Sequence, residues 1–302
     1  MDPNALKTIA ITSNTISIIF TATSIVLFIT ISIINNNIYD SLVYRLSAII
    51  LFGNLILNII NLIQATLLIN STISCYVLEF LSTLSISLSM LYATVIATIL
   101  LINVIYLYEF SKRARCFTYL IPIFLSLLLA GLQAIIGNIE NINNQCGYSN
   151  VEDWLSASLI KLGSVIVSII LCPISYFTIF IYINIRNYNS NQDVLRKGGS
   201  FKQLNWKVLL KLLAYPTIPI LSYLFYFIIL YLITYSEEEL SRLSQMYAAF
   251  QGFSKFLFGF QGVLNACLFF NNTIFLKELK KAYCKLSYPD NHTLLCNNGC
   301  EG

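Results

Sequence analysis

The strongest constraint on this 302-residue chain is a succession of long apolar stretches. Hydrophobic residues make up 57% of the chain and charged residues only 11%, with a mean hydropathy of +0.73. Soluble domains carry about a quarter charged residues, so lipid is the expected solvent. Each stretch reaches the roughly 20 residues of a spanning helix and lacks the alternation of a barrel strand. We therefore expect an all-α bundle of seven transmembrane helices at residues 9–34, 44–69, 76–108, 117–137, 155–185, 206–235 and 246–270.

The distribution of basic residues predicts the orientation of this bundle. Cytoplasmic loops are enriched in lysine and arginine, and an outside amino terminus places 14 of the 18 basic residues in inner loops or at inner helix ends. The outer loops then carry acidic residues, such as Glu140 and the run at 237–239. We expect the amino terminus outside and the carboxyl terminus in the cytoplasm, in a multi-pass plasma-membrane protein. The inner basic residues are Arg45, Lys112, Arg113, Arg115, Arg186, Arg196, Lys197, Lys202, Lys207, Lys211, Lys277, Lys280, Lys281 and Lys285.

The segment after the seventh stretch has the pattern of an amphipathic helix. In residues 273–287, apolar side chains can share one face while four lysines lie near the other, which is typical of a helix at the membrane interface. We expect residues 1–287 to form one membrane domain with this eighth helix, followed by a short tail at 288–302. Cys284 within it is either a palmitoylation site or a free thiol.

Two cysteines fall in the predicted outer region. Cys75 lies where the first outer loop meets the third span, and Cys146 lies in the second outer loop. Both would face an oxidising compartment, so we expect a disulfide between them in preference to two free thiols. Asn70, in the sequon Asn70-Ser71-Thr72, also lies outside and is a predicted glycosylation site, whereas the sequon at Asn291 lies inside.

Amide side chains recur inside the predicted spans. Asn54, Asn58 and Asn61 share one face of the second span, and Gln261 and Asn265 lie one turn apart near the inner end of the seventh. Polar atoms in hydrocarbon need partners, so both sets should face other helices. Two roles are open: the amides hold helices together, or they form a polar latch that differs between two states of the bundle.

Two prolines interrupt the sixth span. Pro216 and Pro219 cannot donate backbone hydrogen bonds and are expected to kink this helix. Lys207 and Lys211 lie one turn apart at its inner end, so a swing of the helix would move both charges. A static kink is the alternative.

The seven spans, the two outer cysteines and the basic inner face together resemble a G-protein-coupled receptor. The signatures of the rhodopsin-like group are absent, because residues 106–113 read YLYEFSKR and Asn265 is followed by Ala266. The pattern Gln261-Gly262-Val263-Leu264-Asn265 is similar to the end of the seventh span in cyclic-AMP-receptor-like and fungal glucose-receptor-like proteins. The sixth span, with Tyr215 and Pro216, is also similar to that group. So is the presence of Arg45 at the start of the second span.

The resemblance implies a receptor that passes an extracellular small-molecule signal, nutrient-like or nucleotide-like, to a heterotrimeric G protein. The implied contact surface for the G protein comprises Lys112, Arg113, Arg115, Lys202, Lys207 and Lys211. Positive-inside topology and anionic lipid explain the same charges without any protein partner. Pro216, Pro219, Gln261, Gly262, Asn265, Asn54 and Asn58 are the implied switch or packing residues.

Lys255 is a charged residue about 13 Å into the seventh span, with Gln251 one turn above it. Glu79 near the outer end of the third span could be its counter-ion, and Lys161 in the fifth span could line the same cavity. Three roles are open: contact with a ligand, a structural lysine that snorkels outward, and a retinal Schiff base as in opsins. The surrounding motifs do not match opsins. The predicted ligand-binding residues are Lys255, Gln251, Glu79 and Lys161.

Other classes of function have less support in the sequence. The only histidine, His292, lies in the tail and no aspartate lies within a span, so an enzyme is not expected. No catalytic residues, metal ligands, cofactor or nucleic-acid partner are predicted. A small-solute transporter is the alternative to a receptor, although no inverted repeat is evident.

Overall fold

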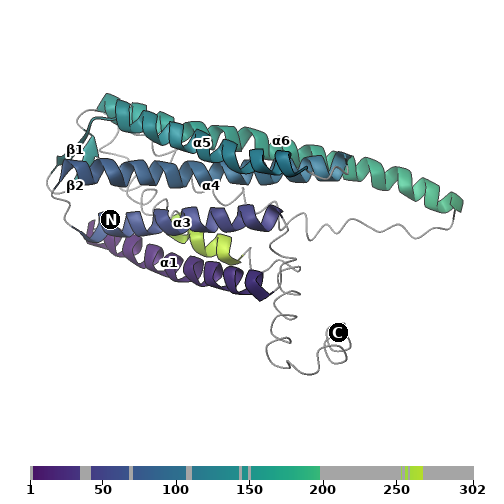
Figure 1. The fold of residues 1–302 in the computed structure, drawn as a ribbon, viewed down its shortest axis with the longest axis horizontal. Helices are drawn as coiled ribbons and strands as arrows, with labels where there is room; N and C mark the ends of the chain where they lie inside the picture. The colour runs from purple at the N-terminus through teal and green to yellow at the C-terminus, as the bar shows by residue number, and fades with distance from the viewer. Residues whose placement is uncertain are drawn as a thin grey trace, which may run out of the picture.

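The computed structural model describes residues 3–34, 42–67, 71–106, 111–142, 145–148, 151–197, 253, 256–257 and 259–267. Five long helices lie side by side along the long axis of the molecule (Figure 1). They are α1 (Pro3–Ile34), α3 (Leu42–Thr66), α4 (Thr72–Tyr106), α5 (Lys112–Ile136) and α6 (Val151–Lys197). Residues 259–267 form a shorter helical segment, which lies against α1 and α3.

Each of the five long helices contains a stretch that is long and apolar enough to cross a membrane. These stretches coincide with the first five predicted spans, which supports a multi-pass membrane bundle. The helices extend beyond the predicted ends, since α6 runs from Val151 to Lys197 around a predicted span of 155–185. Hydrophobicity marks the part of a helix that lipid surrounds, whereas backbone hydrogen bonding continues into polar sequence. The sixth span, most of the seventh and the eighth helix lie outside the described residues.

The connection between α5 and α6 contains a β-hairpin that the all-α prediction did not include. β1 (Ile139–Ile142) pairs antiparallel with β2 (Gln145–Tyr148), with Ile139 opposite Tyr148 and Asn141 opposite Cys146. The helix α5 ends just before it, where the Gly137 backbone N–H donates to the Gln133 carbonyl at 2.8 Å. The hairpin lies at the same end of the bundle as the start of α1 (Figure 1).

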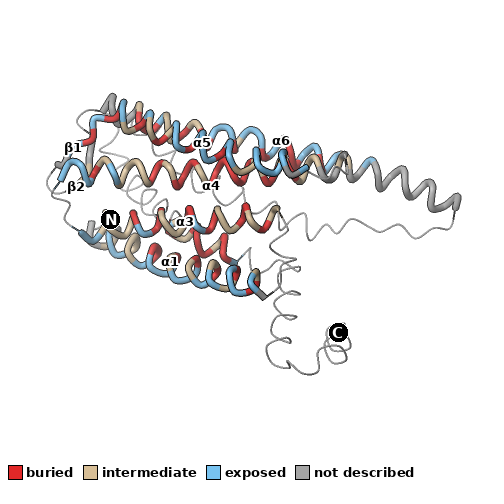
Figure 2. The backbone as a smooth tube through the Cα atoms, in the orientation of Figure 1, coloured by how far each residue is buried: buried red, intermediate tan, exposed pale blue. Residues whose placement is uncertain are grey.

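The helix α4 is the centre of the described bundle. It packs against α3, α5 and α6, while α1 packs on the other side of α3. Buried residues follow α3 and α4, and exposed residues gather on the outer sides of α1, α5 and α6 (Figure 2). The exposed residues of α5 include many large aliphatic side chains, which suits a helix whose outer face meets lipid.

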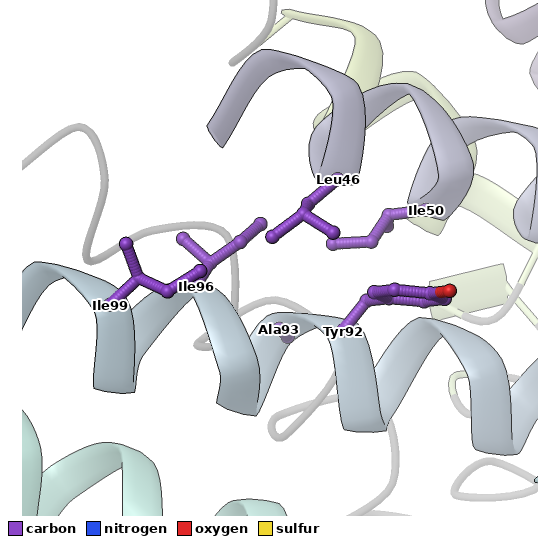
Figure 3. Packing of buried hydrophobic residues seen from close by; sticks show 6 residues of the cluster. All are labelled: Leu46, Ile50, Tyr92, Ala93, Ile96 and Ile99. Atoms are coloured by element: carbon purple, nitrogen blue, oxygen red, sulfur yellow. The ribbon is translucent and has the colours of Figure 1, made fainter. Parts of the chain in front are cut away.

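An apolar cluster joins α3 to α4. Leu46 and Ile50 from α3 lie over Tyr92 of α4, with Ile96 and Ile99 continuing the contact along α4 (Figure 3). The Tyr92 hydroxyl donates to the Tyr119 carbonyl of α5 at 3.0 Å, so its polar end has a partner as a buried tyrosine requires. This cluster fixes α3 and α4 relative to one another.

Hydroxyl groups join α4 to α6. Thr94 and Ser168 lie 2.8 Å apart through their side-chain oxygens, and Ser168 donates to the Met90 carbonyl at 3.0 Å. The Cys172 thiol lies 3.8 Å from the Thr94 hydroxyl. Small polar side chains let two helices approach closely in a membrane, where lipid gives no hydrophobic force between them.

Candidate functional site: two polar clusters in an apolar bundle

A charged pair lies near the hairpin end of the bundle. The Lys161 Nζ of α6 is 2.5 Å from the Glu79 Oε2 of α4, and each side chain is 17% exposed. Ionisable residues within membrane helices are costly unless they pair, and they commonly mark functional sites. The structure thus brings together two of the four predicted ligand-binding residues. The other two, Lys255 and Gln251, lie outside the described residues.

A glutamine and a threonine complete this outer cluster. The Gln133 Nε2 of α5 donates to the Glu79 Oε2 at 3.3 Å, and the Thr83 hydroxyl of α4 donates to the Gln133 Oε1. Glu79 therefore connects three helices. Sequence reasoning missed Gln133 and Thr83, although a single amide near the end of an otherwise apolar span was a usable signal. We call Glu79, Thr83, Gln133 and Lys161 the outer cluster.

A disulfide attaches the hairpin to α4 one turn above Glu79. Cys75 and Cys146 are joined with an S–S distance of 2.07 Å and a Cα–Cα distance of 5.3 Å. Cys75 and Ile139 are both buried at this junction, and Tyr76 and Leu78 pack against them. Of the two alternatives for these cysteines, the structure contains the disulfide. The hairpin is therefore held close to the outer cluster.

A second polar cluster joins α3 to the helical segment 259–267. Asn54, Asn58, Gln261 and Asn265 are each no more than 2% exposed. The Gln261 Nε2 donates to the Asn54 Oδ1 at 3.3 Å, so the two amide sets contact each other. Asn54 is the middle residue of α3, so Gln261 contacts the middle of this helix. Asn61 is only partly buried.

The amide cluster also reaches α1. The Asn58 Nδ2 donates to the Ser17 Oγ at 3.1 Å and to the Asn54 carbonyl at 2.7 Å. Sequence reasoning missed Ser17 and the other small polar residues on this face of α1, although Ser13, Ser17 and Thr21 recur every fourth residue. We call Asn54, Asn58, Gln261 and Asn265 the amide cluster.

Two glycines allow the segment 259–267 to approach α1 closely. A Cβ atom at Gly259 would collide with Ser13. A Cβ atom at Gly262 would collide with Ser17, would lie 2.8 Å from the Thr21 Cγ2 and would lie 3.0 Å from the Asn58 Nδ2. Gly262, predicted as a switch or packing residue, lies at this close contact.

The remaining predicted sites are only partly described. Arg113 and Arg115 are exposed in the first turn of α5, where the Ser111 hydroxyl accepts from the Ala114 N–H at 3.3 Å. The side chain of Lys112 is not described. No group of three or more histidine, cysteine, aspartate or glutamate side chains suited to a metal occurs among the described residues. Outside those residues lie Lys202, Lys207, Lys211, Pro216, Pro219, Asn70 and Cys284.

No protein-family model matches this chain, and no curated protein matches its sequence. The function is therefore inferred from the residues and their arrangement.

Proposed function

We propose that this chain is a G-protein-coupled receptor that responds to an extracellular small molecule with a polar or charged group. The observation that carries the proposal is the outer cluster, which lies beneath a disulfide-bound hairpin at one end of a bundle of apolar helices. A helix bundle that serves only as an anchor has no need of a carboxylate and an ammonium group inside it.

The outer cluster offers a means of sensing a ligand. Glu79 accepts from both Lys161 and Gln133, so one carboxylate links α4, α5 and α6. A ligand with an anionic group would compete with Glu79 for the Lys161 ammonium, and a cationic ligand would compete with Lys161 for Glu79. Either exchange alters the contacts of three helices at once.

A route to the opposite end runs through α4 and α3. A Cβ atom at Gly53 of α3 would lie 2.9 Å from the Ser89 Oγ of α4, so the two helices touch directly beside Asn54. Asn54 in turn accepts from Gln261. A displacement of α4 would therefore act on the amide cluster and on the segment 259–267. In the proposed receptor these amide contacts differ between the resting and active states.

The G-protein surface in this proposal is the basic face at the other end of the bundle. Arg113 and Arg115 are exposed there at the start of α5, opposite the end that carries the hairpin. Lys112, Lys202, Lys207 and Lys211 belong to the same proposed surface.

Nucleotide exchange on a purified heterotrimeric G protein tests the proposal. The full-length protein in lipid nanodiscs is screened with sugars, nucleotides, amino acids and lipids, and ligand-dependent exchange is the expected result. Lys161→Met should raise the half-maximal concentration of the active ligand by tenfold or more. The matched control is Lys7→Met, because Lys7 is an exposed lysine on α1 and should leave the potency unchanged.

Two outcomes would contradict the receptor. One is the absence of exchange on every G-protein class with every ligand. The other is net solute flux into liposomes without any nucleotide exchange, which would identify a transporter.

A further inference from the structure

The outer cluster holds two opposite charges that pair with each other inside the bundle. The Lys161 Nζ of α6 lies 2.5 Å from the Glu79 Oε2 of α4, and each side chain is 17% exposed. Glu79 is also the only acidic residue in the seven predicted spans. A ligand that enters this cluster therefore meets a carboxylate and an ammonium group that already satisfy each other.

A ligand with a single charge would have to separate this pair. An anionic ligand on Lys161 takes the ammonium group away from Glu79, and a cationic ligand on Glu79 takes the carboxylate away from Lys161. In either case one protein charge loses its partner at a place that is mostly shielded from water, which is strongly unfavourable. The predicted spans contain no second acidic side chain that could replace Glu79.

A zwitterionic ligand avoids this cost. Its ammonium group can donate to Glu79 while its carboxylate accepts from Lys161, so the charges of the protein and of the ligand are all paired. The two ligand groups must lie close together, because the two protein groups start in direct contact. The α-amino acids meet this condition, since a single carbon atom joins their ammonium group to their carboxylate. We infer that the outer cluster binds a free α-amino acid, an assignment that rests on the proposed function and names its ligand.

Two buried side chains keep Glu79 in place when Lys161 turns towards the ligand. The Gln133 Nε2 donates to the Glu79 Oε2 at 3.3 Å, and the Thr83 hydroxyl donates to the Gln133 Oε1. Thr83 and Gln133 are at most 1% exposed, so they hold the carboxylate from within the bundle. Lys161 has a flexible four-carbon stem, which lets its ammonium group follow the ligand carboxylate.

Binding to the purified full-length protein in lipid nanodiscs tests the assignment without any G protein. The thermal midpoint is measured with each of the common α-amino acids, because a ligand that binds the folded state raises it. The most stabilising amino acid is then compared with two analogues: the amine that lacks its carboxylate and the acid that lacks its ammonium group. Each analogue should bind at least about tenfold more weakly than the amino acid. Equal or tighter binding of either analogue, or no binding by any amino acid, would overturn the proposal.

Two variants should change the preference for these ligands in opposite directions. Lys161→Met removes the ammonium partner of Glu79, so the amine analogue should gain affinity relative to the amino acid. Glu79→Gln removes the carboxylate partner of Lys161, so the acid analogue should gain instead. The expected gain is about tenfold in each variant. An unchanged preference in both variants would contradict the assignment.

The controls separate loss of the charges from loss of the fold. The double variant Glu79→Gln/Lys161→Met carries neither charge and should bind none of the three ligands, while a cooperative unfolding transition verifies its fold. Lys7→Met changes an exposed lysine on α1 and should keep the preference of the wild type. Amino-acid binding by the double variant with the affinity of the wild type would place the ligand elsewhere and overturn the proposal.

The same measurements distinguish the ligand class from the proposed receptor function. Binding of an amino acid with the expected preference, but without nucleotide exchange on any G protein, would support the ligand class and contradict the receptor. Nucleotide exchange driven only by singly charged or uncharged ligands would support the receptor and overturn the ligand class.

Discussion

Lys161 of α6 and Glu79 of α4 meet at 2.5 Å inside a bundle of helices that are otherwise apolar. The two residues are 82 positions apart in the chain, and each belongs to a helix that also contacts the rest of the bundle. Their pairing satisfies two charges that would each be costly alone in a membrane. It also joins two helices at the end where the hairpin is attached.

The stability of the protein should fall more when one member of the charged pair is lost than when both members are lost. Lys161→Met leaves the Glu79 carboxylate without its ammonium partner and should lower the free energy of unfolding by about 3 kcal/mol. The double variant Glu79→Gln/Lys161→Met removes both charges and should recover most of that loss. Thermal unfolding of the three proteins, followed by intrinsic fluorescence, measures the difference. A double variant less stable than either single variant would show that the pair has no coupling.

The disulfide should stabilise the protein by closing a long loop. Cys75 and Cys146 are separated by 71 positions, and closing a loop of that length restricts the unfolded chain by up to about 4 kcal/mol. Cys75→Ser should lower the thermal midpoint, and a reducing agent should lower the midpoint of the wild-type protein but not that of Cys75→Ser. Cys116→Ser is the control, because Cys116 is an exposed free cysteine. If a reducing agent lowered the thermal midpoints of Cys75→Ser and of the wild type equally, the assigned disulfide would be contradicted.

Two glycines should respond in opposite directions to the same substitution. Gly262→Ala places a Cβ atom against Ser17, Thr21 and Asn58, so it should destabilise the protein by about 1–3 kcal/mol. Gly131→Ala in α5 meets nothing within 4 Å and should stabilise the helix by up to about 1 kcal/mol. Thermal midpoints of the two variants should therefore fall on either side of the wild type. Stabilisation by alanine at both positions would rule out the tight contact between the segment 259–267 and α1.

Glycosylation reports the orientation of the bundle. With the amino terminus outside, Asn70 should acquire a glycan during synthesis into microsomes, and Asn70→Gln should abolish the increase in mass. The two sequons near the carboxyl terminus, at Asn271 and Asn291, should remain unmodified. Since glycosylation fails close to a membrane, a second protein with a lengthened first outer loop serves as the positive control. A glycan at Asn291 would reverse the predicted orientation.

Sequence alone was sufficient to predict the helices that hydrophobicity defines. The first five spans match long apolar helices, because burial in lipid requires about 20 apolar residues whatever the neighbouring helices do. The β-hairpin could not be foreseen in the same way. The segment 139–148 is short and polar. The pairing of its two strands depends on the disulfide and on the packing of Ile139 against α4.

The candidate site was predictable where a residue is unusual for its surroundings. Glu79, Lys161, Asn54 and Gln261 were identified because charges and amides are rare in spans. Which of them meet was less predictable. Lys161, expected only to line the cavity, is the direct partner of Glu79, and Gln133 joins them from a third helix. Such pairings depend on the rotation of each helix about its axis, which packing determines and hydropathy does not.

The contact between α1 and the segment 259–267 also has a consequence for synthesis in the cell. A ribosome adds about 5–20 residues per second, so α1 waits on the order of 10–50 s for the segment that covers its small polar face. Hydroxyl groups on that face already donate to carbonyls of their own helix: Thr21 to Ser17 at 2.7 Å and Ser24 to Phe20 at 2.7 Å. These internal bonds let α1 remain in lipid until its late partner arrives.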